Sequence, residues 1–326
     1  MADLVSPADL QAAAARISGH VLRTPLVPYS EPAESGSRLL VKAECLQRVG
    51  AFKQRGAFAK VSALDAAARA RGVVAHSSGN HAQAVAYAAR ALGVTATIVI
   101  PDNAPANKVA ATEAHGATVV RCAPSGAARL AEAERIAAET GAVMVPPYDD
   151  PVVIAGQGTV GMEIIEDEAG ADVVLVPVSG GGLISGVATA IKTHSPRTRV
   201  VGVEPELAAD ARDSLRAGHP VAWDPAETAR TSADGLRVER VGDLTFAHMR
   251  EYVDDIVTVS EEEIRAAVQG LGARTRLVSE PSGAVATAAY LFHRAELPRG
   301  GTFVSVLSGG NITPDRYAAL LTEPIA

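Results

Sequence analysis

The sequence predicts an α/β protein built from two doubly wound units. Short apolar runs alternate with alanine-rich helical stretches along most of the 326-residue chain. Continuous apolar strands that alternate with helices indicate a parallel sheet covered on both faces. The strands are more numerous than one compact unit needs, so we expect two units.

Each element is placed by its own local signal. A helix is expected to begin after Ser6 and to end near Ile17, because serine caps a helix and the following proline suits its first turn. The segment 145–151 carries three prolines and is the expected hinge, and 210–243 is expected to be irregular. Strands are expected at 38–45, 73–76, 95–100, 118–122, 142–146, 172–178, 199–204 and 302–307. Helices are expected near 53–69, 81–92, 107–115, 127–139, 160–169, 183–194, 261–271 and 283–293.

The composition is that of an ordinary soluble globular protein, with 48% hydrophobic and 21% charged residues. A net charge of −7 and an aromatic content of 4% argue against a nucleic-acid partner. The two cysteines, Cys45 and Cys122, are too few for a disulfide framework and fit no metal motif. No signal peptide and no membrane-spanning apolar run is visible, so a cytoplasmic location without a membrane partner is expected.

One lysine lies between an aromatic ring and a turn of small residues, in the octapeptide GAFKQRGA at 50–57. Burial disfavours the charged form of an amine, and a lysine that forms a Schiff base needs this lowering of its pKa. We therefore expect Lys53 to carry the aldehyde of pyridoxal phosphate. On the octapeptide alone, an ordinary helix start with Lys53, Arg55 and Lys60 as solvated charges is the better interpretation.

Three small-residue turns follow expected strands, at the edge where open α/β sheets bind ligands. Their glycines let backbone N–H groups approach a ligand, and a helix N-terminus adds free donors for an anion. Each turn taken alone is equally well explained as a tight turn. The second turn also loosely matches a dinucleotide fingerprint through Gly180, Gly182, Gly186 and Glu204, but the spacing is poor and Lys53 stays unexplained. The three turns are SSGNH at 77–81, SGGGL at 179–183 and SGGN at 308–311.

Together these motifs resemble those of fold-type II pyridoxal phosphate enzymes, and most closely the serine/threonine dehydratases and serine racemase. The resemblance implies a tryptophan synthase β-like fold of two doubly wound domains with the cofactor in the cleft between them. It divides the chain into a large domain, 1–65 with 150–326, and a small domain, 66–149, in the short form without a regulatory domain. The motifs follow the family's order: GAFKQRGA (50–57), SSGNHAQ (77–83), PPYDDPVVIAGQGT (146–159), SGGGL (179–183), VEPE (203–206), ADG (233–235), EPSGA (280–284) and SGGN (308–311).

The resemblance also implies which residues hold the cofactor. Lys53 would bind its aldehyde and act as the base on one face of the substrate, and Phe52 would lie against the pyridine ring. Asn80 would bond the phenolic oxygen and Ser308 the pyridine nitrogen. The cofactor phosphate would be cradled by Ser179, Gly180, Gly181, Gly182 and Leu183.

Substrate and cation ligands are implied in the same way. Ser77, Ser78, Asn80 and His81 would bind the substrate, and Ser78 stands where the racemase has its acid/base on the opposite face. A cation site is implied by Glu204, the carbonyl of Ala208 and Asp210, which are hard oxygen ligands suited to Mg²⁺ or Ca²⁺. A solvated acidic loop is the alternative interpretation of these three residues.

The implied reaction is β-elimination from L-serine, L-threonine or a related β-hydroxy amino acid, giving a 2-oxo acid and ammonia. Ser308 is a neutral partner for the pyridine nitrogen, so the ring is a weaker electron sink and loss of a β-leaving group is favoured over transamination. One alternative is a racemase for serine or an aspartate-type substrate that uses Lys53 and Ser78 on opposite faces; Tyr148, where the racemase has an asparagine, weakens it. Another is a dehydratase for 3-hydroxyaspartate or phenylserine. A homodimer or homotetramer is expected.

Overall fold

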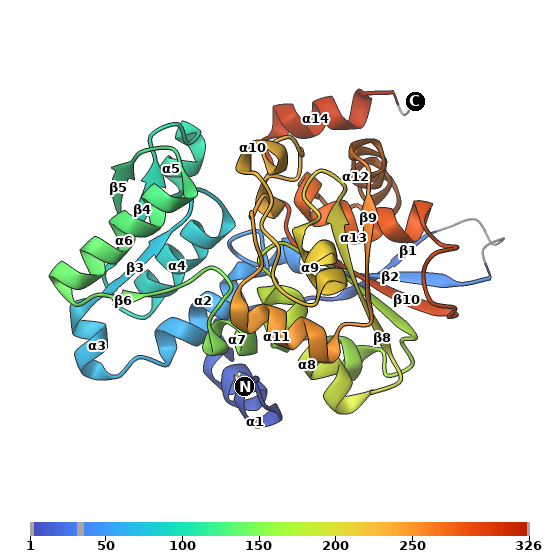
Figure 1. Cartoon of the computed structure of the whole chain (residues 1–326), viewed down its shortest axis with the longest axis horizontal. Helices are drawn as coiled ribbons and strands as arrows, with labels where there is room; N and C mark the ends of the chain where they lie inside the picture. Colours follow the sequence, from blue (N-terminus) through green and yellow to red (C-terminus); the bar gives the residue numbers. More distant parts are fainter. Residues whose placement is uncertain (1–2, 31–35, 325–326) are drawn as a thin grey trace.

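The computed structural model describes residues 3–30 and 36–324, which form two lobes with one β-sheet each (Figure 1). The smaller lobe contains β3 (Val73–His76), β4 (Ala96–Pro101), β5 (Thr118–Cys122) and β6 (Val143–Met144). The larger lobe contains β1 (Leu26–Tyr29), β2 (Arg38–Ala43), β7 (Val173–Pro177), β8 (Arg199–Pro205), β9 (Asp255–Val259) and β10 (Thr302–Leu307).

The two sheets are almost entirely parallel. The six-stranded sheet has the order β1-β2-β10-β7-β8-β9, and the four-stranded sheet has the order β5-β4-β3-β6. Among the described strand pairs only β1 with β2 is antiparallel. The expected α/β architecture with two sheets is therefore confirmed, and all parallel strands within a sheet direct their carboxyl ends to the same edge.

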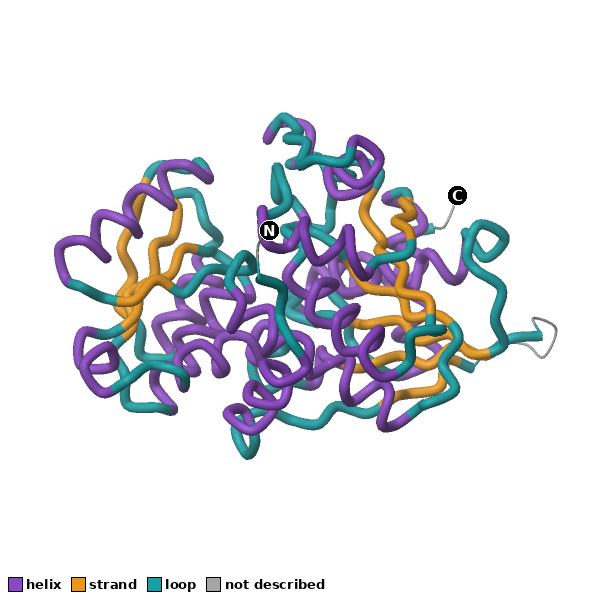
Figure 2. Tube along the Cα trace, turned by 60° about the horizontal axis from the view of Figure 1, so that its bottom comes forward, coloured by secondary structure: helices purple, strands orange, loops and turns teal. Residues whose placement is uncertain are grey.

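Helices cover both faces of each sheet and also lie between the two groups of strands (Figure 2). The described helices are α1 (Pro7–Ile17), α2 (Lys53–Ser62), α3 (Ala66–Arg71), α4 (Asn80–Ala91), α5 (Ala106–Ala114), α6 (Gly126–Thr140), α7 (Pro151–Asp167), α8 (Gly182–His194), α9 (Asp210–Ala217), α10 (Pro225–Thr228), α11 (Asp243–Tyr252), α12 (Glu261–Thr275), α13 (Pro281–Phe292) and α14 (Pro314–Thr322). Two 3₁₀ turns, η1 (Glu44–Leu46) and η2 (Asp234–Leu236), complete the described elements. None of the described helices is long and apolar enough to cross a membrane.

The side chains of a buried strand point alternately to the two faces of the sheet, and each face packs against different helices. In β7, Val173 and Leu175 join a core with α12 and α13, whereas Val174 and Val176 join a core with α7 and α8. Successive side chains of a strand point to opposite faces, so a strand that is apolar throughout can serve both cores. The small sheet is divided in the same way, between α4 on one face and α6 on the other.

Two expected helices have different limits in the structure. The helix expected at 53–69 is interrupted, because Asp65 accepts a 2.7 Å hydrogen bond from the amide of Ala68 and starts a second helix, α3. The helix expected to begin near 160 begins at Pro151, where Asp150 accepts bonds from the amides of Val152 (2.9 Å) and Val153 (3.0 Å). The chain therefore enters the larger lobe at Pro151 through a helix start that Asp150 caps.

Other expectations about the chain path were wrong. The stretch 210–243 is not irregular throughout, since it contains α9, α10 and η2. The expected strands 38–45 and 142–146 are shorter, and they correspond to β2 and β6. Two strands (β1, β9) and two helices (α11, α14) were not expected.

Glycines allow the helices α2, α7 and α8 to approach closely at the centre of the molecule. A Cβ on Gly156 of α7 would lie 2.7 Å from the Cα of Gly56 in α2 and 2.9 Å from the carbonyl oxygen of Arg55. On the other side of α7, a Cβ on Gly158 would lie 2.9 Å from the carbonyl oxygen of Gly186 in α8. These contacts involve backbone atoms, which cannot move aside as a flexible side chain can. Tertiary packing therefore outweighs the poor helix propensity of glycine.

The close approach of α7 to α2 predicts that Gly156→Ala destabilises the protein. Alanine has the better helix propensity, by roughly 1 kcal/mol, but overpacking against backbone costs on the order of 1–3 kcal/mol or more. We expect a lower free energy of unfolding in urea. Gly301→Ala is the control, because its Cβ would meet nothing closer than 3.8 Å. A Gly156→Ala variant as stable as the control would contradict the packing account.

Candidate active site

Lys53 is the first residue of α2 and contacts the connection between the two lobes. Its Nζ donates a 2.6 Å hydrogen bond to the carbonyl of Pro147, and it lies 5.1 Å from the centroid of the Phe52 ring. Lys53 as a residue is half-buried, but burial of its amine lowers its pKa to about 8. The amine is therefore far more readily deprotonated than that of a solvated lysine.

The start of α2 is fixed by a buried network of charges. Arg55 is fully buried and donates to Glu44 through two hydrogen bonds of 2.7 and 2.8 Å, and to Glu163 of α7 through two bonds of 2.6 and 2.8 Å. Lys42 of β2, also fully buried, donates to Oε2 of Glu163 at 2.6 Å. Burial disfavours the charge of Arg55, but the carboxylates of Glu44 and Glu163 outweigh it and raise its pKa. Arg55 is thus not a solvated charge, and it holds α2 against β2 and α7.

The turn between β7 and α8 leaves donors without partners. Ser179 Oγ is buried and has no hydrogen-bond partner within the described ranges, and no side chain caps α8. Gly181 has φ +91°, a conformation that other residues rarely adopt. The Tyr148 ring covers Gly180, and a Cβ on Gly182 would lie 2.8 Å from the Cβ of Tyr148. A serine hydroxyl and uncapped amides at a helix N-terminus are suited to an anion of the size of a phosphate group.

Ser308 follows β10 and lies beside the lysine motif. It is 5% exposed, and its carbonyl accepts a 3.0 Å hydrogen bond from the amide of Phe52. Gly309 forms an antiparallel bridge with Ala51. The structure therefore brings the lysine motif (50–57) and the SGGN turn (308–311) into direct contact.

Asn80, the first residue of α4, is held by two side chains of the larger lobe. Its Nδ2 donates to Glu280 Oε1 at 2.6 Å, and its Oδ1 accepts from Asn311 Nδ2 at 2.8 Å. Asn311 Nδ2 also donates to the carbonyl of Val49 at 2.7 Å. Burial, together with the charge of Asp234, raises the pKa of Glu280 to about 7. One Nδ2 proton of Asn80 remains for a ligand.

In the serine turn after β3, some side chains already have hydrogen-bond partners within the protein and others do not. His81 is buried, and its Nε2 bonds the Val145 carbonyl at 2.8 Å; burial and the charge of Lys53 lower its pKa to about 3. The His81 ring is therefore neutral and engaged, which leaves its backbone N–H for a substrate. Ser77 Oγ accepts from the amide of Gly79 at 3.1 Å, whereas Ser78 is half-buried and its hydroxyl forms no hydrogen bond to the described residues.

The helix starts at this place carry no cap from their own N-cap residue. The helices α2, α4 and α8 lack such a cap, as do α5 and α13, whereas α1, α6 and α12 are capped by serine hydroxyls. In α2 the amide of Gly56 donates instead to Gln157 Oε1 at 3.1 Å. Uncapped amides remain unsatisfied unless water or a ligand binds them. Three such starts beside Lys53 indicate a site for a ligand with several polar groups.

The expected cation ligands lie together at the end of β8. Glu204 is fully buried and accepts hydrogen bonds from the amides of Ala211 (3.1 Å) and Arg212 (2.8 Å), so it caps α9. Both carboxylate oxygens of Asp210 are buried without a hydrogen-bond partner within the described ranges. Burial raises the pKa of both acids, that of Asp210 to about 7; the charge of Asp210 adds to the rise at Glu204, and the charge of Asp213 adds to the rise at Asp210. Two buried carboxylates with unused oxygen lone pairs are a donor set suited to a hard divalent cation.

Sequence reasoning missed the side chains that support the site. The buried network (Lys42, Glu44, Arg55, Glu163) has no local signal, because its members come from three separate parts of the chain. Glu280 and Asn311 lie within the EPSGA and SGGN motifs. A polar side chain inside such a small-residue motif was the signal that could have indicated a role in the site.

The fold and the site are typical of one class of protein, the α/β enzymes that bind an anionic cofactor at the carboxyl ends of their strands, next to a desolvated lysine. Residues 17–309 match the family described as pyridoxal-phosphate dependent enzyme, and the chain belongs to that family.

Three relatives illustrate the similarity. The L-threo-3-hydroxyaspartate ammonia-lyase of Saccharomyces cerevisiae is 43% identical over 315 residues, which is 96% of this chain and 95% of that protein. The solved structure of the T.th. threonine deaminase is 46% identical, covers 94% of this chain and 99% of its own, and has a TM-score of 0.88. The maize serine racemase structure is 38% identical, covers 97% of each chain, and has a TM-score of 0.91.

The buried network predicts a large effect of Arg55→Met. The substitution leaves Glu44 and Glu163 buried without their shared cation, which costs on the order of 3–5 kcal/mol in the free energy of unfolding. Arg23→Gln is the control, because its pairs with Glu166 and Asp167 are exposed and such pairs contribute about 1 kcal/mol or less. Urea unfolding of both variants measures the difference. Equal losses would show that the network does not hold α2.

Proposed function

We propose that this protein is a pyridoxal phosphate-dependent ammonia-lyase that converts L-serine, L-threonine or a related β-hydroxy amino acid into a 2-oxo acid and ammonia. The observation that supports this most is the desolvated amine of Lys53, which lies beside Phe52 and Ser308 and contacts Pro147 in the lobe connection. The names of similar proteins, which are ammonia-lyases for threonine and for 3-hydroxyaspartate, agree with this reaction.

The residues present fit the cofactor. The unpartnered hydroxyl of Ser179 and the uncapped start of α8 suit its phosphate, and the lowered pKa of Lys53 suits a covalent bond to its aldehyde. Asn80 and Ser308 would bond the ring oxygen and ring nitrogen. When bound, pyridoxal phosphate supplies an electron sink for the carbon that loses its proton.

The protein's own groups would then bind the substrate and move its protons. The hydroxyls of Ser77 and Ser78 and the free amides at the start of α4 would bind the α-carboxylate. The neutral amine of Lys53 would take the α-proton, and the β-hydroxyl would leave as water. Hydrolysis of the released product gives the 2-oxo acid and ammonia.

Racemisation is a second candidate activity, and the free hydroxyl of Ser78 favours it. A racemase needs an acid/base on each face of the substrate, and Ser78 is half-buried with no side-chain hydrogen bond among the described residues. Both reactions begin with loss of the α-proton, so one protein can carry out both.

The lysine assignment predicts the behaviour of Lys53→Ala. The purified wild-type protein should show a visible absorbance band from the bound cofactor, and the variant should lack the band of the covalently attached form. With a panel of β-hydroxy amino acids, 2-oxo acid formation should fall by at least about 10³-fold in the variant. A colourless wild type that pyridoxal phosphate does not reconstitute would overturn the proposal.

The two activities are separated by Ser78→Ala with L-serine as substrate. Chirally resolved product analysis should show D-serine that depends on Ser78 if the protein racemises, and only pyruvate and ammonia if it is a lyase alone. Loss of both products would instead show that Ser78 binds the carboxylate.

We also propose a divalent cation, Mg²⁺ or Ca²⁺, bound by Glu204, the Ala208 carbonyl and Asp210. Protons compete with a cation at Asp210, whose pKa is raised to about 7. A carboxyl with a raised pKa destabilises the folded state as pH rises, and a bound cation offsets this loss.

The cation proposal predicts that adding Mg²⁺ or Ca²⁺ after chelation raises the temperature of unfolding. At a concentration about 100 times the Kd the gain is about 2.7 kcal/mol, and it should be larger at roughly pH 8 than at roughly pH 6. Asp210→Asn should abolish the gain, and Glu206→Gln, an exposed neighbour, should keep it. The same gain in both variants would contradict the site.

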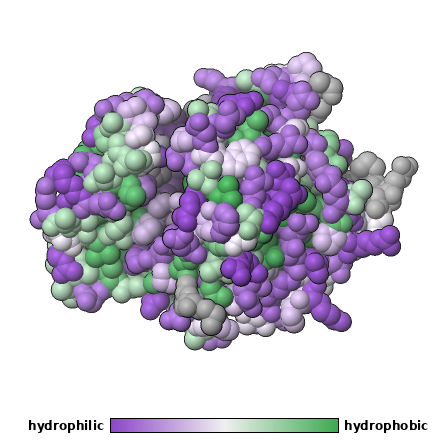
Figure 3. Space-filling view, viewed as in Figure 1, coloured by the Kyte–Doolittle hydropathy of each residue, from purple (hydrophilic) through white to green (hydrophobic). Residues whose placement is uncertain are grey.

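Domain limits, assembly and location complete the proposal. We place a large domain at 1–65 with 150–326 and a small domain at 66–149, which assigns one sheet to each domain. The face of the molecule in Figure 3 is mostly polar and is indented where the lobes meet. A homodimer or homotetramer in the cytoplasm fits the composition and the substrate class.

A further inference from the structure

We propose that the first turn of α11 holds the phosphate turn (179–183) in its ligand-binding conformation, with Thr245 and Asp149 as positioning residues. The inference rests on the proposed function, because it identifies what supports the turn that would bind the cofactor phosphate. Three observations carry it: the turn is rich in glycine, α11 bonds directly to its backbone, and α11 is itself held by the lobe connection (145–150).

The phosphate turn has few side chains of its own to fix its conformation. Three of its five residues are glycines, and Gly181 has φ +91°, a conformation that few other residues adopt. The helix that follows, α8, begins at Gly182 without a side-chain cap. Glycine loses more conformational freedom on folding than other residues do. A turn that is held in its binding conformation beforehand loses less entropy when a ligand binds.

Thr245 fixes one peptide group of the turn. Its side chain is fully buried, and its Oγ1 donates a 2.7 Å hydrogen bond to the carbonyl of Gly180; the carbonyl of Gly242, at 3.1 Å, is the more distant acceptor of the same proton. A trans peptide directs its C=O and its N–H to opposite sides. A Gly180 carbonyl bound to α11 therefore turns the amide of Gly181 away from α11. That amide donates no hydrogen bond to the described residues, so it is available to an anion.

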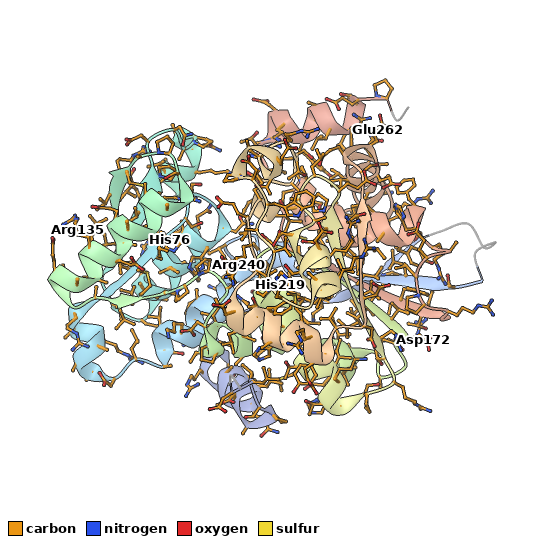
Figure 4. All side chains as sticks on the ribbon, viewed as in Figure 1. His76, Arg135, Asp172, His219, Arg240 and Glu262 are labelled. Atoms are coloured by element: carbon orange, nitrogen blue, oxygen red, sulfur yellow. The ribbon has the colours of Figure 1, made fainter. Side chains whose placement is uncertain are left out.

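Packing adds to this bond. A Cβ on Gly181 would lie 2.8 Å from the Cβ of Thr245, so the turn lies directly on α11. Ser185, in the first turn of α8, donates from its Oγ to the carbonyl of Thr245 at 3.2 Å. Figure 4 labels Arg240, which pairs with Asp243 of α11, at the boundary of the two lobes in this view. The start of α11 thus contacts both the turn and the helix that follows it.

The lobe connection in turn holds α11. The N-cap residue of α11 is Gly242, which has no side chain, and Asp149 caps the helix from 95 residues away. Its Oδ1 accepts hydrogen bonds from the amides of Leu244 and Thr245, both at 3.0 Å. A Cβ on Gly242 would overlap this carboxylate. A carboxylate at a helix N-terminus satisfies free amides and is favoured by the helix dipole.

Three successive residues of the lobe connection contact the two proposed anchors of the cofactor. The carbonyl of Pro147 accepts from the amine of Lys53 at 2.6 Å. The ring of Tyr148 lies on Gly180, and the next residue, Asp149, caps α11. One short segment therefore contacts the lysine that would bind the aldehyde and, through α11, the turn that would bind the phosphate.

A purely structural role of Thr245 is the rival explanation. Loss of its buried hydroxyl would then lower the stability of the larger lobe and weaken every ligand to the same extent. The positioning role instead predicts a loss confined to ligands that carry a phosphate. Pyridoxal keeps the ring and the aldehyde of pyridoxal phosphate but lacks the phosphate, so it separates the two explanations.

The test measures the Kd of pyridoxal phosphate and of pyridoxal for the cofactor-free wild-type protein and for Thr245→Val, with visible absorbance as the signal. We expect the variant to bind pyridoxal phosphate about 3- to 10-fold more weakly, as loss of one hydrogen bond implies, and to bind pyridoxal as the wild type does. In the holoenzyme, the ³¹P resonance of the bound cofactor should shift in the variant, while the visible absorbance maximum stays. Thr245→Ser keeps the hydroxyl and should restore the wild-type values.

A matched control and a second pair of variants complete the test. Thr112→Val removes an equally buried hydroxyl, which bonds the carbonyl of Lys108 within α5, and should change neither Kd. Asp149→Ala should repeat the loss for pyridoxal phosphate. Asp149→Asn should keep most of the affinity, because an amide oxygen can still accept the bonds from α11. The two Asp149 variants decide the question if Thr245→Val does not fold.

Three outcomes overturn the inference: an unchanged Kd of pyridoxal phosphate in Thr245→Val, an equal loss for pyridoxal, or an equal loss in Thr112→Val. If any of these occurs while the wild type forms 2-oxo acids, the ammonia-lyase function stands without it. If the wild type does not bind pyridoxal phosphate, the proposed function fails, and inorganic phosphate becomes the probe. A rise in unfolding temperature with phosphate that Thr245→Val removes would then support the positioning role, and no rise, or one that the variant keeps, would overturn it.

Discussion

The buried pairing of Arg55 with Glu44 and Glu163 is the constraint on which the site depends. With Lys42 the set contains two cations and two anions, so its charges compensate one another inside a region from which water is excluded. An ion pair of this kind tolerates little displacement, because any unpaired member would remain desolvated. The network joins β2 and η1 to α2 and α7, and it begins two residues after Lys53. The lysine is therefore positioned by charges that it does not touch.

The buried network holds the start of α2 in place, although several polar groups around Lys53 have no hydrogen-bond partner. Uncapped helix starts, a serine hydroxyl without a partner and a desolvated amine each cost free energy in the protein alone. They occur together around Lys53, whereas the starts of α1 and α12 are capped by their own serines. The glycine contacts between α2, α7 and α8 add a closely packed support behind these groups. A ligand with an anionic end and several polar edges would recover the free energy of all of them at once.

How far the sequence predicts the structure depends on whether the signal is local. Strands such as β3 and β10 are apolar runs and were placed correctly, and the glycine turns lie at strand ends as parallel topology requires. The start of α7 was missed because Gly156, Gly158 and Gly161 have poor helix propensity, and their purpose is contact with other helices. The octapeptide alone favours a solvated Arg55, because Glu163 lies more than a hundred residues away. Local patterns thus predict where a backbone turn lies, and only the fold shows which distant side chain meets it.

The two lobes divide the work of the site in the proposed assignment. Lys53, the turn at Ser179 and Ser308 come from the larger lobe, where the buried network and the glycine contacts hold them. Ser77, Ser78 and Asn80 come from the smaller lobe, whose sheet packs on α4 and α6 and shares none of those charges. A substitution in the serine turn is therefore expected to change substrate binding without disturbing the position of the lysine.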